Sequence, residues 1–237
     1  MSLLYLLLLA HLIVDFMQPS ALVRWSKKST YGLLVHSSLY VLLNVLILAF
    51  VPLWWLWVLV LGTSHFFVDK AKVILNNKMP KIGLLVFVLD QVVHISIIIL
   101  LFFLVHLGSA EPSPQIIKII DHPQVLLYAV GYVAATFGGS ILIFEVSNSV
   151  INNTSSKKVI SIKERLKGIS ERGIAMTLIL LGHTNGFFLL VAPLAFIPSV
   201  IQGKKALQGD QERTRFILEL TTSFCLAFST GIILYFL

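Results

Sequence analysis

The chain consists of long apolar runs joined by short polar loops, and this pattern restricts the fold more than any other feature. About 20 apolar residues in a helix cross the roughly 30 Å hydrocarbon layer of a membrane. The composition agrees, because 57% of the 237 residues are hydrophobic and 12% are charged, whereas soluble domains carry about 25% charged residues. We therefore expect an all-α fold, a polytopic transmembrane helical bundle.

Seven apolar segments are expected to be helical. They are Leu3–Met17, Tyr31–Val51, Leu53–Val73, Ile82–Leu107, Val125–Asn148, Ile174–Ile201 and Phe216–Leu237. The sixth is interrupted by Gly182-His183-Thr184-Asn185-Gly186 and has basic residues on both flanks. We expect six spanning helices plus a re-entrant hairpin with this interruption at its tip, and seven spans are the alternative. The whole chain, 1–237, is expected to be one integral membrane domain, with a polar-site half over 1–107 and a supporting half over 108–237.

Basic residues are unevenly distributed along the chain, which has a formal net charge of +7. They follow the first, third and fifth apolar segments, and cytoplasmic loops carry the excess of Lys and Arg. The N-terminus is therefore expected outside, and with the hairpin every Lys and Arg except Lys118 is cytoplasmic. The charge thus indicates orientation, and no nucleic-acid partner is expected. The single cysteine, Cys225, excludes an internal disulfide framework and a cysteine-based zinc site.

Three His/Asp pairs interrupt the apolar helices with the same spacing. They are His11 with Asp15, His65 with Asp69, and Asp90 with His94. Residues four apart lie on one face of a helix, so each pair forms one polar patch. A further histidine, His36, lies about one turn into the second segment, and the expected topology puts all seven residues in the cytoplasmic half of the bilayer.

These residue types suit a divalent metal, with zinc the first expectation and iron or manganese as alternatives. We expect His11, His65 and His94 to ligate, and Asp69 or Asp90 to serve as a further ligand or as the catalytic base. Asp15 and His36 remain candidate ligands. A metal-bound water would be the nucleophile. The alternative is that each pair neutralises itself in an interhelical contact.

Other polar residues are candidates for contact with a substrate. Ser37, Ser38 and Tyr40 lie one turn from His36, and helix packing explains them equally well. His183 and Asn185 at the proposed hairpin tip are further candidates. A turn residue hydrogen-bonded to the backbone is the simpler interpretation of His183.

The polar residues of the first four segments resemble the pattern of an uncharacterised family of bacterial inner-membrane proteins, a domain of unknown function. The residues that carry the resemblance are His11, Asp15, Phe16 and Gln18; Lys27 or Lys28; His36; His65, Phe66, Asp69 and Lys72; and Asp90, Gln91 and His94. The family tends to have a second histidine where this chain has Tyr40. Later, Ile169-Ser170-Glu171-Arg172 and Glu219 show a looser likeness. The resemblance implies a bacterial inner-membrane setting and supplies no activity.

Three functions are compatible with these features. The first is a membrane-embedded, metal-dependent hydrolase that acts on a lipid or lipid-linked substrate in the surrounding lipid bilayer. The second is a proton- or cation-coupled transporter, in which the same groups relay protons. The third is a non-catalytic sensor or assembly protein, and a homo-oligomer is compatible with all three. No second copy of the His/Asp pattern follows residue 110, which favours one fixed site over the repeated halves of a carrier.

Overall fold

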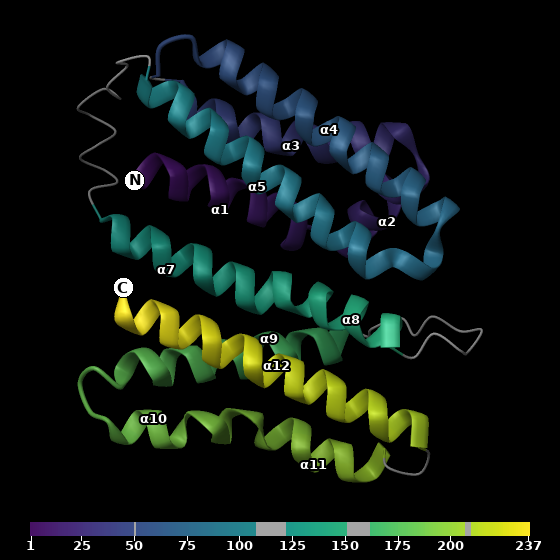
Figure 1. The fold of residues 1–237 in the computed structure, drawn as a ribbon, viewed down its shortest axis with the longest axis vertical. Coiled ribbons are helices and arrows are strands. Elements are labelled where there is room, and N and C mark those ends of the chain that lie inside the picture. The colour runs from purple at the N-terminus through teal and green to yellow at the C-terminus, as the bar shows by residue number, and fades with distance from the viewer. Residues whose placement is uncertain (50, 108–121, 151–161, 207–209) are drawn as a thin grey trace. The chain divides into compact units, whose positions relative to one another are not determined.

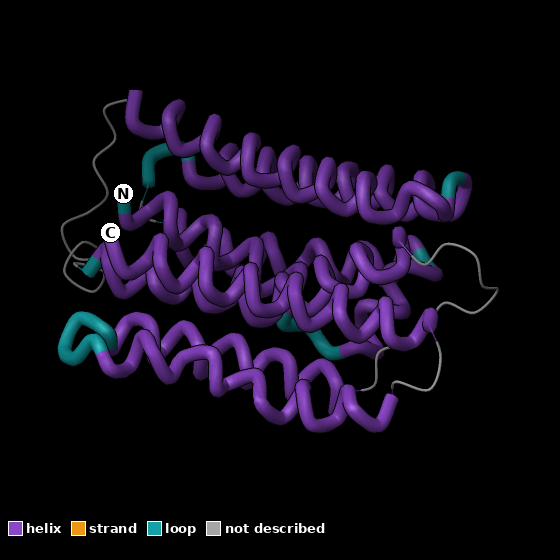
Figure 2. Tube along the Cα trace, turned by 60° about the horizontal axis from the view of Figure 1, so that its bottom comes forward, coloured by secondary structure: helices purple, strands orange, loops and turns teal. Residues whose placement is uncertain are grey.

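A computed structural model describes residues 1–49, 51–107, 122–150, 162–206 and 210–237. Regular structure in these ranges is helical throughout, and no strand occurs among them, as expected (Figures 1 and 2). The chain divides into two compact units, residues 1–130 and 131–237. Each unit is described by itself. The expected external Lys118 and the basic Lys157 and Lys158 lie outside the described residues.

The first unit is built on four long helices joined by short connections. The elements are α1 (Ser2–Phe16), α2 (Ser20–Lys28), α3 (Thr30–Leu48), α4 (Trp54–Lys78), the short 3₁₀ helix η1 (Pro80–Ile82) and α5 (Gly83–Leu107). Both α1 and α4 pack against α3 and α5, so α1, α3, α4 and α5 form a closed four-helix arrangement (Figure 1).

The interior of this bundle has an apolar layer next to a polar one. Leu7, Tyr40, Leu61 and Ile98, one from each long helix, belong to the buried apolar core. The His/Asp residues follow one to two turns further along α1 and α4, and precede the core residues on α3 and α5. Because successive long helices run in opposite directions, the polar residues of all four helices lie on the same side of the apolar layer, where they meet.

The basic segment after α1 is a helix, where the sequence was interpreted as a polar loop. Residues 21–28 of α2 lie at 85° to α1. Gly32 allows α2 and α3 to approach closely, because a Cβ atom at this position would lie 2.6 Å from the backbone carbonyl carbon and oxygen of Trp25. Lys27 and Lys28 lie in the last turn of α2, where cations interact favourably with the helix dipole.

The second unit contains the C-terminal helices. They are α7 (Pro123–Val133), which begins before the unit boundary, the π-helical turn η2 (Ala134–Gly138), α8 (Gly139–Val150), α9 (Ile162–Leu181), α10 (Phe187–Val191), the 3₁₀ helix η3 (Ala192–Phe196), α11 (Ile197–Ala206) and α12 (Asp210–Phe236). The sixth apolar run turns at residues 182–186, and α10 and η3 pack back against α9 (Figure 1). The helix break in the expected hairpin is therefore present, and its re-entry into a membrane stays a prediction.

Four helices of the described chain are long and apolar enough to cross a membrane. They are Thr30–Leu48, Gly83–Leu107, Pro123–Val150 and Glu212–Phe236. A fifth is added if α1 and the bent segment after it form one span. The helix α4 has 25 residues, which is sufficient length, but it falls outside this set because its polar residues lower its hydropathy. The helices are consistent with a multi-pass membrane protein, and six spans are not established.

Candidate metal centre

The structure brings the seven ionisable residues of the His/Asp pattern into one cluster inside the first unit. We call this the His/Asp cluster, and its members are His11 and Asp15 on α1, His36 on α3, His65 and Asp69 on α4, and Asp90 and His94 on α5. No side chain among them is more than 9% exposed. The spacing of four along three helices predicted the shared faces, and the closed bundle makes these faces converge.

Gln91 on α5 fixes the protonation pattern on one side of the cluster. Its amide nitrogen Nε2 donates to Asp15 Oδ2 at 3.2 Å and to Asp90 Oδ2 at 2.9 Å. The amide oxygen Oε1 therefore faces His11 Nε2 at 3.2 Å and accepts a hydrogen bond from it. Since the proton of a neutral imidazole is then on Nε2, the other nitrogen, His11 Nδ1, carries a lone pair. His11 Nδ1 is buried and has no hydrogen-bond partner.

His94 and His65 present free nitrogens in the same way. His94 Nδ1 donates to the backbone oxygen of Asp90 at 2.9 Å, which leaves its buried Nε2 as an unpartnered acceptor. His65 Nδ1 is also buried without a partner. The His94 ring stacks on His11 with centroids 4.7 Å apart and lies at the same distance from the His65 ring. Each of these three histidines offers a ring nitrogen within 4.8 Å of the others, and we call them the tris-histidine set.

A second group of ligand atoms lies on the other side of His65. We call it the four-residue set, and it consists of Asp15, His36, His65 and Asp69. His36 Nε2 lies 3.0 Å from Asp69 Oδ2 and 3.2 Å from His65 Nε2, and the latter two atoms are 3.3 Å apart. Asp15 Oδ1 lies 3.7 Å from His36 Nε2 and 3.6 Å from His65 Nε2. The other nitrogen of His36, Nδ1, donates to Gln18 Oε1 at 2.8 Å.

Lys72 on α4 is the cation that borders the cluster. Its Nζ lies 2.5 Å from Asp90 Oδ2 and 4.0 Å from Asp69 Oδ1, and its side chain is 23% exposed. Three aspartates and one lysine, with the imidazoles neutral, leave the cluster with two uncompensated negative charges. Burying such charge is costly unless it is paired or coordinates a cation. The cluster is therefore suited to one or more divalent cations.

The three predicted substrate-lining residues on α3 have different environments. Ser37 is buried and its Oγ has no hydrogen-bond partner. Ser38 is exposed and donates to the backbone oxygen of Leu34 at 2.8 Å. The Tyr40 ring stacks on His65 with centroids 4.3 Å apart. Of these residues, only Tyr40 contacts a ring of the His/Asp cluster.

The other two predicted substrate-lining residues, His183 and Asn185, lie in the exposed turn of the second unit. His183 Nε2 donates to the backbone oxygen of Tyr235 at 2.6 Å, and the two rings stack with centroids 3.8 Å apart. Asn185 Oδ1 accepts a hydrogen bond from the backbone nitrogen of Phe187 at 2.9 Å, at the start of α10. The simpler interpretation of His183, a turn residue hydrogen-bonded to the backbone, therefore holds.

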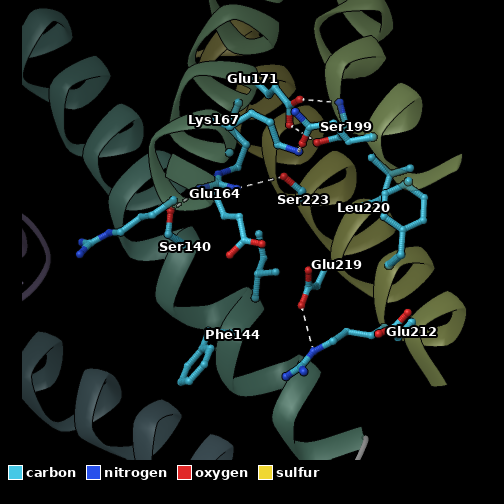
Figure 3. A pocket seen from close by; sticks show the side chains of 18 residues that line it. Ser140, Phe144, Glu164, Lys167, Glu171, Ser199, Glu212, Glu219, Leu220 and Ser223 are labelled. Carbon is cyan, nitrogen blue, oxygen red and sulfur yellow. Dashed lines mark hydrogen bonds and ion pairs between the residues drawn. The ribbon is translucent and has the colours of Figure 1, made fainter. Parts of the chain in front are cut away.

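A cavity of about 470 Å³ lies in the second unit, between α8, α9, α11 and α12 (Figure 3). Buried Arg172 forms part of its lining and donates to the backbone oxygens of Ala135 at 2.8 Å and Thr136 at 2.6 Å. These carbonyls belong to the π-helical turn, where the regular α-helical hydrogen bonds are interrupted. Arg215 and Glu219 also line the cavity, and they form an ion pair in which Arg215 Nε lies 3.3 Å from Glu219 Oε1. Both arginines thus have structural partners.

The described chain is thus an all-helical protein with a buried His/Asp cluster, and its long apolar helices are consistent with a multi-pass membrane protein. Residues 3–118 match the model of the family described as "Protein of unknown function (DUF3307)". The resemblance to a domain of unknown function is thereby confirmed over these residues, which include all of the His/Asp cluster. The looser likeness at 169–172 and Glu219 lies outside the matched range. No curated protein matches, and no solved structure matches.

Three residues of the centre had no role assigned from the sequence. Gln18 orients His36, Gln91 orients His11, and Lys72 pairs with Asp90. A signal was present, since Gln91 adjoins Asp90 and Lys72 follows Asp69 by three residues on one helix face. Spacing alone did not indicate their partners, because all three act across helices.

Proposed function

We propose that this protein is a membrane-embedded, metal-dependent hydrolase whose reactive ion is bound by the tris-histidine set. The observation that carries the proposal is three buried imidazoles with neighbouring nitrogens that hydrogen bonds leave unused. Three histidine ligands plus a bound water is a known arrangement of catalytic zinc. Zinc is the first choice for the ion, and iron or manganese suits the same ligands.

The hydrogen bonds around the three histidines support this assignment. A metal-ligating histidine usually donates its other N–H to a carbonyl or carboxylate, which fixes its tautomer and orientation. His94 does so through the Asp90 backbone oxygen, and His11 through the Gln91 side chain. Such bonds leave the opposite nitrogen of each ring ready to bind an ion.

Asp90 is the proposed general base. Its Oδ1 is buried without a hydrogen-bond partner, while its Oδ2 accepts from Lys72 and Gln91. A metal-bound water has a pKa lowered towards neutrality, and a carboxylate beside it accepts the proton as the water attacks an ester, amide or phosphoester. Lys72 holds Asp90 in place and provides a cation for the developing negative charge.

A bilayer setting makes lipids or lipid-linked compounds the proposed substrates. The side chains opposite the cluster are apolar and exposed, among them Phe67 on α4 and Leu85 and Val92 on α5. We propose six spans, with α4 counted as one despite its polar residues, and an N-terminus outside the bacterial inner membrane. Lys72, the most exposed side chain of the centre, marks the side from which a headgroup would approach.

The test uses the full chain in nanodiscs of bacterial lipid extract, with zinc supplied. Metal content is measured by elemental mass spectrometry, and lipid products are followed by mass spectrometry over time. The double variant His11→Ala, His94→Ala should lose the metal ion of the tris-histidine set and product formation. At saturating zinc, Asp90→Asn should still hold metal at the three histidines and lose product formation, because it removes the base and leaves all three ligands in place.

His106→Ala is the matched control for His94. His106 lies on the same helix and makes the same bond to the backbone four residues earlier, at 3.1 Å, but is not part of the cluster. This variant should retain metal and activity. A wild-type protein that binds no metal, or a double variant that keeps its full metal content while folded, would contradict the proposal.

A second candidate function, a proton- or cation-coupled carrier, is favoured by the partly buried Lys72–Asp90 pair beside the His/Asp cluster. Connected ionisable groups inside a membrane commonly form proton relays. Proteoliposomes with an internal pH-sensitive dye test this candidate directly. Substrate-driven proton movement that Asp90→Asn abolishes, without any lipid product, would favour the carrier.

A further inference from the structure

We infer that the protein binds a second divalent cation, in the four-residue set of Asp15, His36, His65 and Asp69. The inference rests on the proposed function only in taking the tris-histidine set as the first site. It adds a dinuclear centre in which His65 belongs to both sets.

The distances within the four-residue set match a tetrahedral ion. Zinc bonds to imidazole nitrogen and carboxylate oxygen are about 2.0–2.1 Å, so two ligand atoms in a tetrahedral shell lie about 3.3–3.4 Å apart. The three distances between His36 Nε2, His65 Nε2 and Asp69 Oδ2 are 3.0, 3.2 and 3.3 Å. Asp15 Oδ1 lies slightly further away, at 3.6–3.7 Å from the two nitrogens. The four atoms therefore surround a point suited to an ion.

Hydrogen bonding explains these contacts less well than a cation does. Asp15 Oδ1 and Asp69 Oδ2 are both buried and have no hydrogen-bond partner. His36 Nδ1 donates to Gln18, so the Nε2 of a neutral ring carries a lone pair directed at the other three atoms. An imidazole N–H can occupy only one of the contacts among these four atoms, as between His36 Nε2 and His65 Nε2, and a bound cation would offset the repulsion among the remaining acceptors.

His65 is the residue that connects the two sites. Its Nε2 faces the four-residue set, and its Nδ1 is the buried nitrogen that hydrogen bonds leave free. For one imidazole to contact both ions, one through each nitrogen, its ring proton must pass to solvent water, which leaves His65 as a bridging imidazolate. Two ions in hydrolytic sites typically share ligands at short separation and hold the attacking and leaving oxygens.

The charge of the centre is compatible with two ions. The buried groups carry a net charge of −2, from three aspartates and Lys72. Two divalent cations change this to +2, and a bound hydroxide together with a deprotonated His65 bridge returns it to zero. The four-residue set by itself, with two aspartates and one divalent ion, is neutral, so it does not leave unpaired charge in the bundle interior.

The experiment is a metal stoichiometry measured on the full chain in detergent and in nanodiscs, after loading with zinc and desalting. Wild type should hold two equivalents. The double variant His36→Ala, Asp69→Ala should hold one equivalent, in the tris-histidine set, and His11→Ala, His94→Ala should hold one in the four-residue set. His106→Ala should hold two. Folding of each variant is checked by circular dichroism and gel filtration, and His36→Gln with Asp69→Asn replaces the alanine pair if that pair does not fold.

The outcomes separate this inference from the proposed function. One equivalent in wild type that His11→Ala, His94→Ala removes and His36→Ala, Asp69→Ala leaves would refute the second ion and retain the first. The reverse pattern would support the four-residue site and refute the tris-histidine site. No metal in any protein would refute both.

Discussion

Charge rescue at the Lys72–Asp90 pair tests the electrostatics of the centre most sharply. Lys72 Nζ lies 2.5 Å from Asp90 Oδ2, and the Asp90 side chain is 1% exposed. In Asp90→Asn the lysine loses its counter-charge but still faces Asp69 Oδ1 at 4.0 Å. The net charge of the centre changes from −2 to −1, and the free cation repels a metal ion bound by Asp69.

The size of this repulsion follows from the geometry. An ion bound to Asp69 would lie roughly 5–6 Å from Lys72 Nζ, and charges of +1 and +2 at that distance interact by about 6 kcal/mol at an effective dielectric constant of about 20. Lys72 is 23% exposed, so it can extend towards water and reduce the effect. We therefore expect Asp90→Asn to weaken metal binding at least tenfold, about 1.4 kcal/mol.

The rescue variant is Lys72→Met, Asp90→Asn, which restores the net charge of −2. Metal affinity, measured by competition with a chromophoric chelator, should return to within a few-fold of wild type, while product formation stays lost because the base is absent. Lys78→Met, an exposed lysine of the same helix, is the control and should change neither. A double variant that binds metal as weakly as Asp90→Asn would show that Asp90 is itself a ligand and refute this reasoning.

Three other substitutions test parts of the structure by thermal unfolding in detergent. Gln91→Leu removes two hydrogen bonds to buried carboxylates and should cost about 3 kcal/mol, and it should lower metal affinity because His11 loses its orienting partner; unchanged affinity would contradict that role. Arg172→Met removes the side-chain donor to the Ala135 backbone oxygen and one of two donors to the Thr136 backbone oxygen, which should cost about 2–4 kcal/mol while metal content stays at the wild-type level. Gly32→Ala places a Cβ 2.6 Å from the backbone of Trp25 and should cost about 1–3 kcal/mol; an unchanged unfolding temperature would show that α2 does not pack as described.

Much of the first unit could be predicted from the sequence because two periodicities coincide there. Apolar runs gave the long helices α3, α4 and α5 to within a few residues, and the spacing of four placed His and Asp on one face of each helix. The helical character of the basic segment after α1 was missed because its nine residues are fewer than the 11–18 over which helical periodicity is recognised. Its formation depends on packing against α3 at Gly32.

The grouping of the candidate ligands, which include a third set of Asp15, Asp90 and His94, was not predictable, because spacing along a helix does not determine contacts between helices. The sequence placed His36 beside the other residues, yet its Nε2 makes the shortest contact in the four-residue set, with Asp69 on another helix. The orientation of each imidazole depends on Gln18, Gln91 and one backbone carbonyl. Which nitrogen of a ring carries the proton, and which is left to bind an ion, depends on these hydrogen-bond partners.

The geometry also bears on the interpretation in which each His/Asp pair merely neutralises itself. That interpretation expects contacts between helices, and such contacts are present, because His36 Nε2 lies 3.0 Å from Asp69 Oδ2 and Lys72 Nζ lies 2.5 Å from Asp90 Oδ2. Within each helix the three pairs lie at 3.9, 3.3 and 3.6 Å. In an apolar bundle an unused buried lone pair is costly, and each pair retains at least one buried atom without a partner. These unpartnered atoms are the ones that the proposed cations would contact, so the metal content of the purified protein separates bound cations from helix association as their explanation.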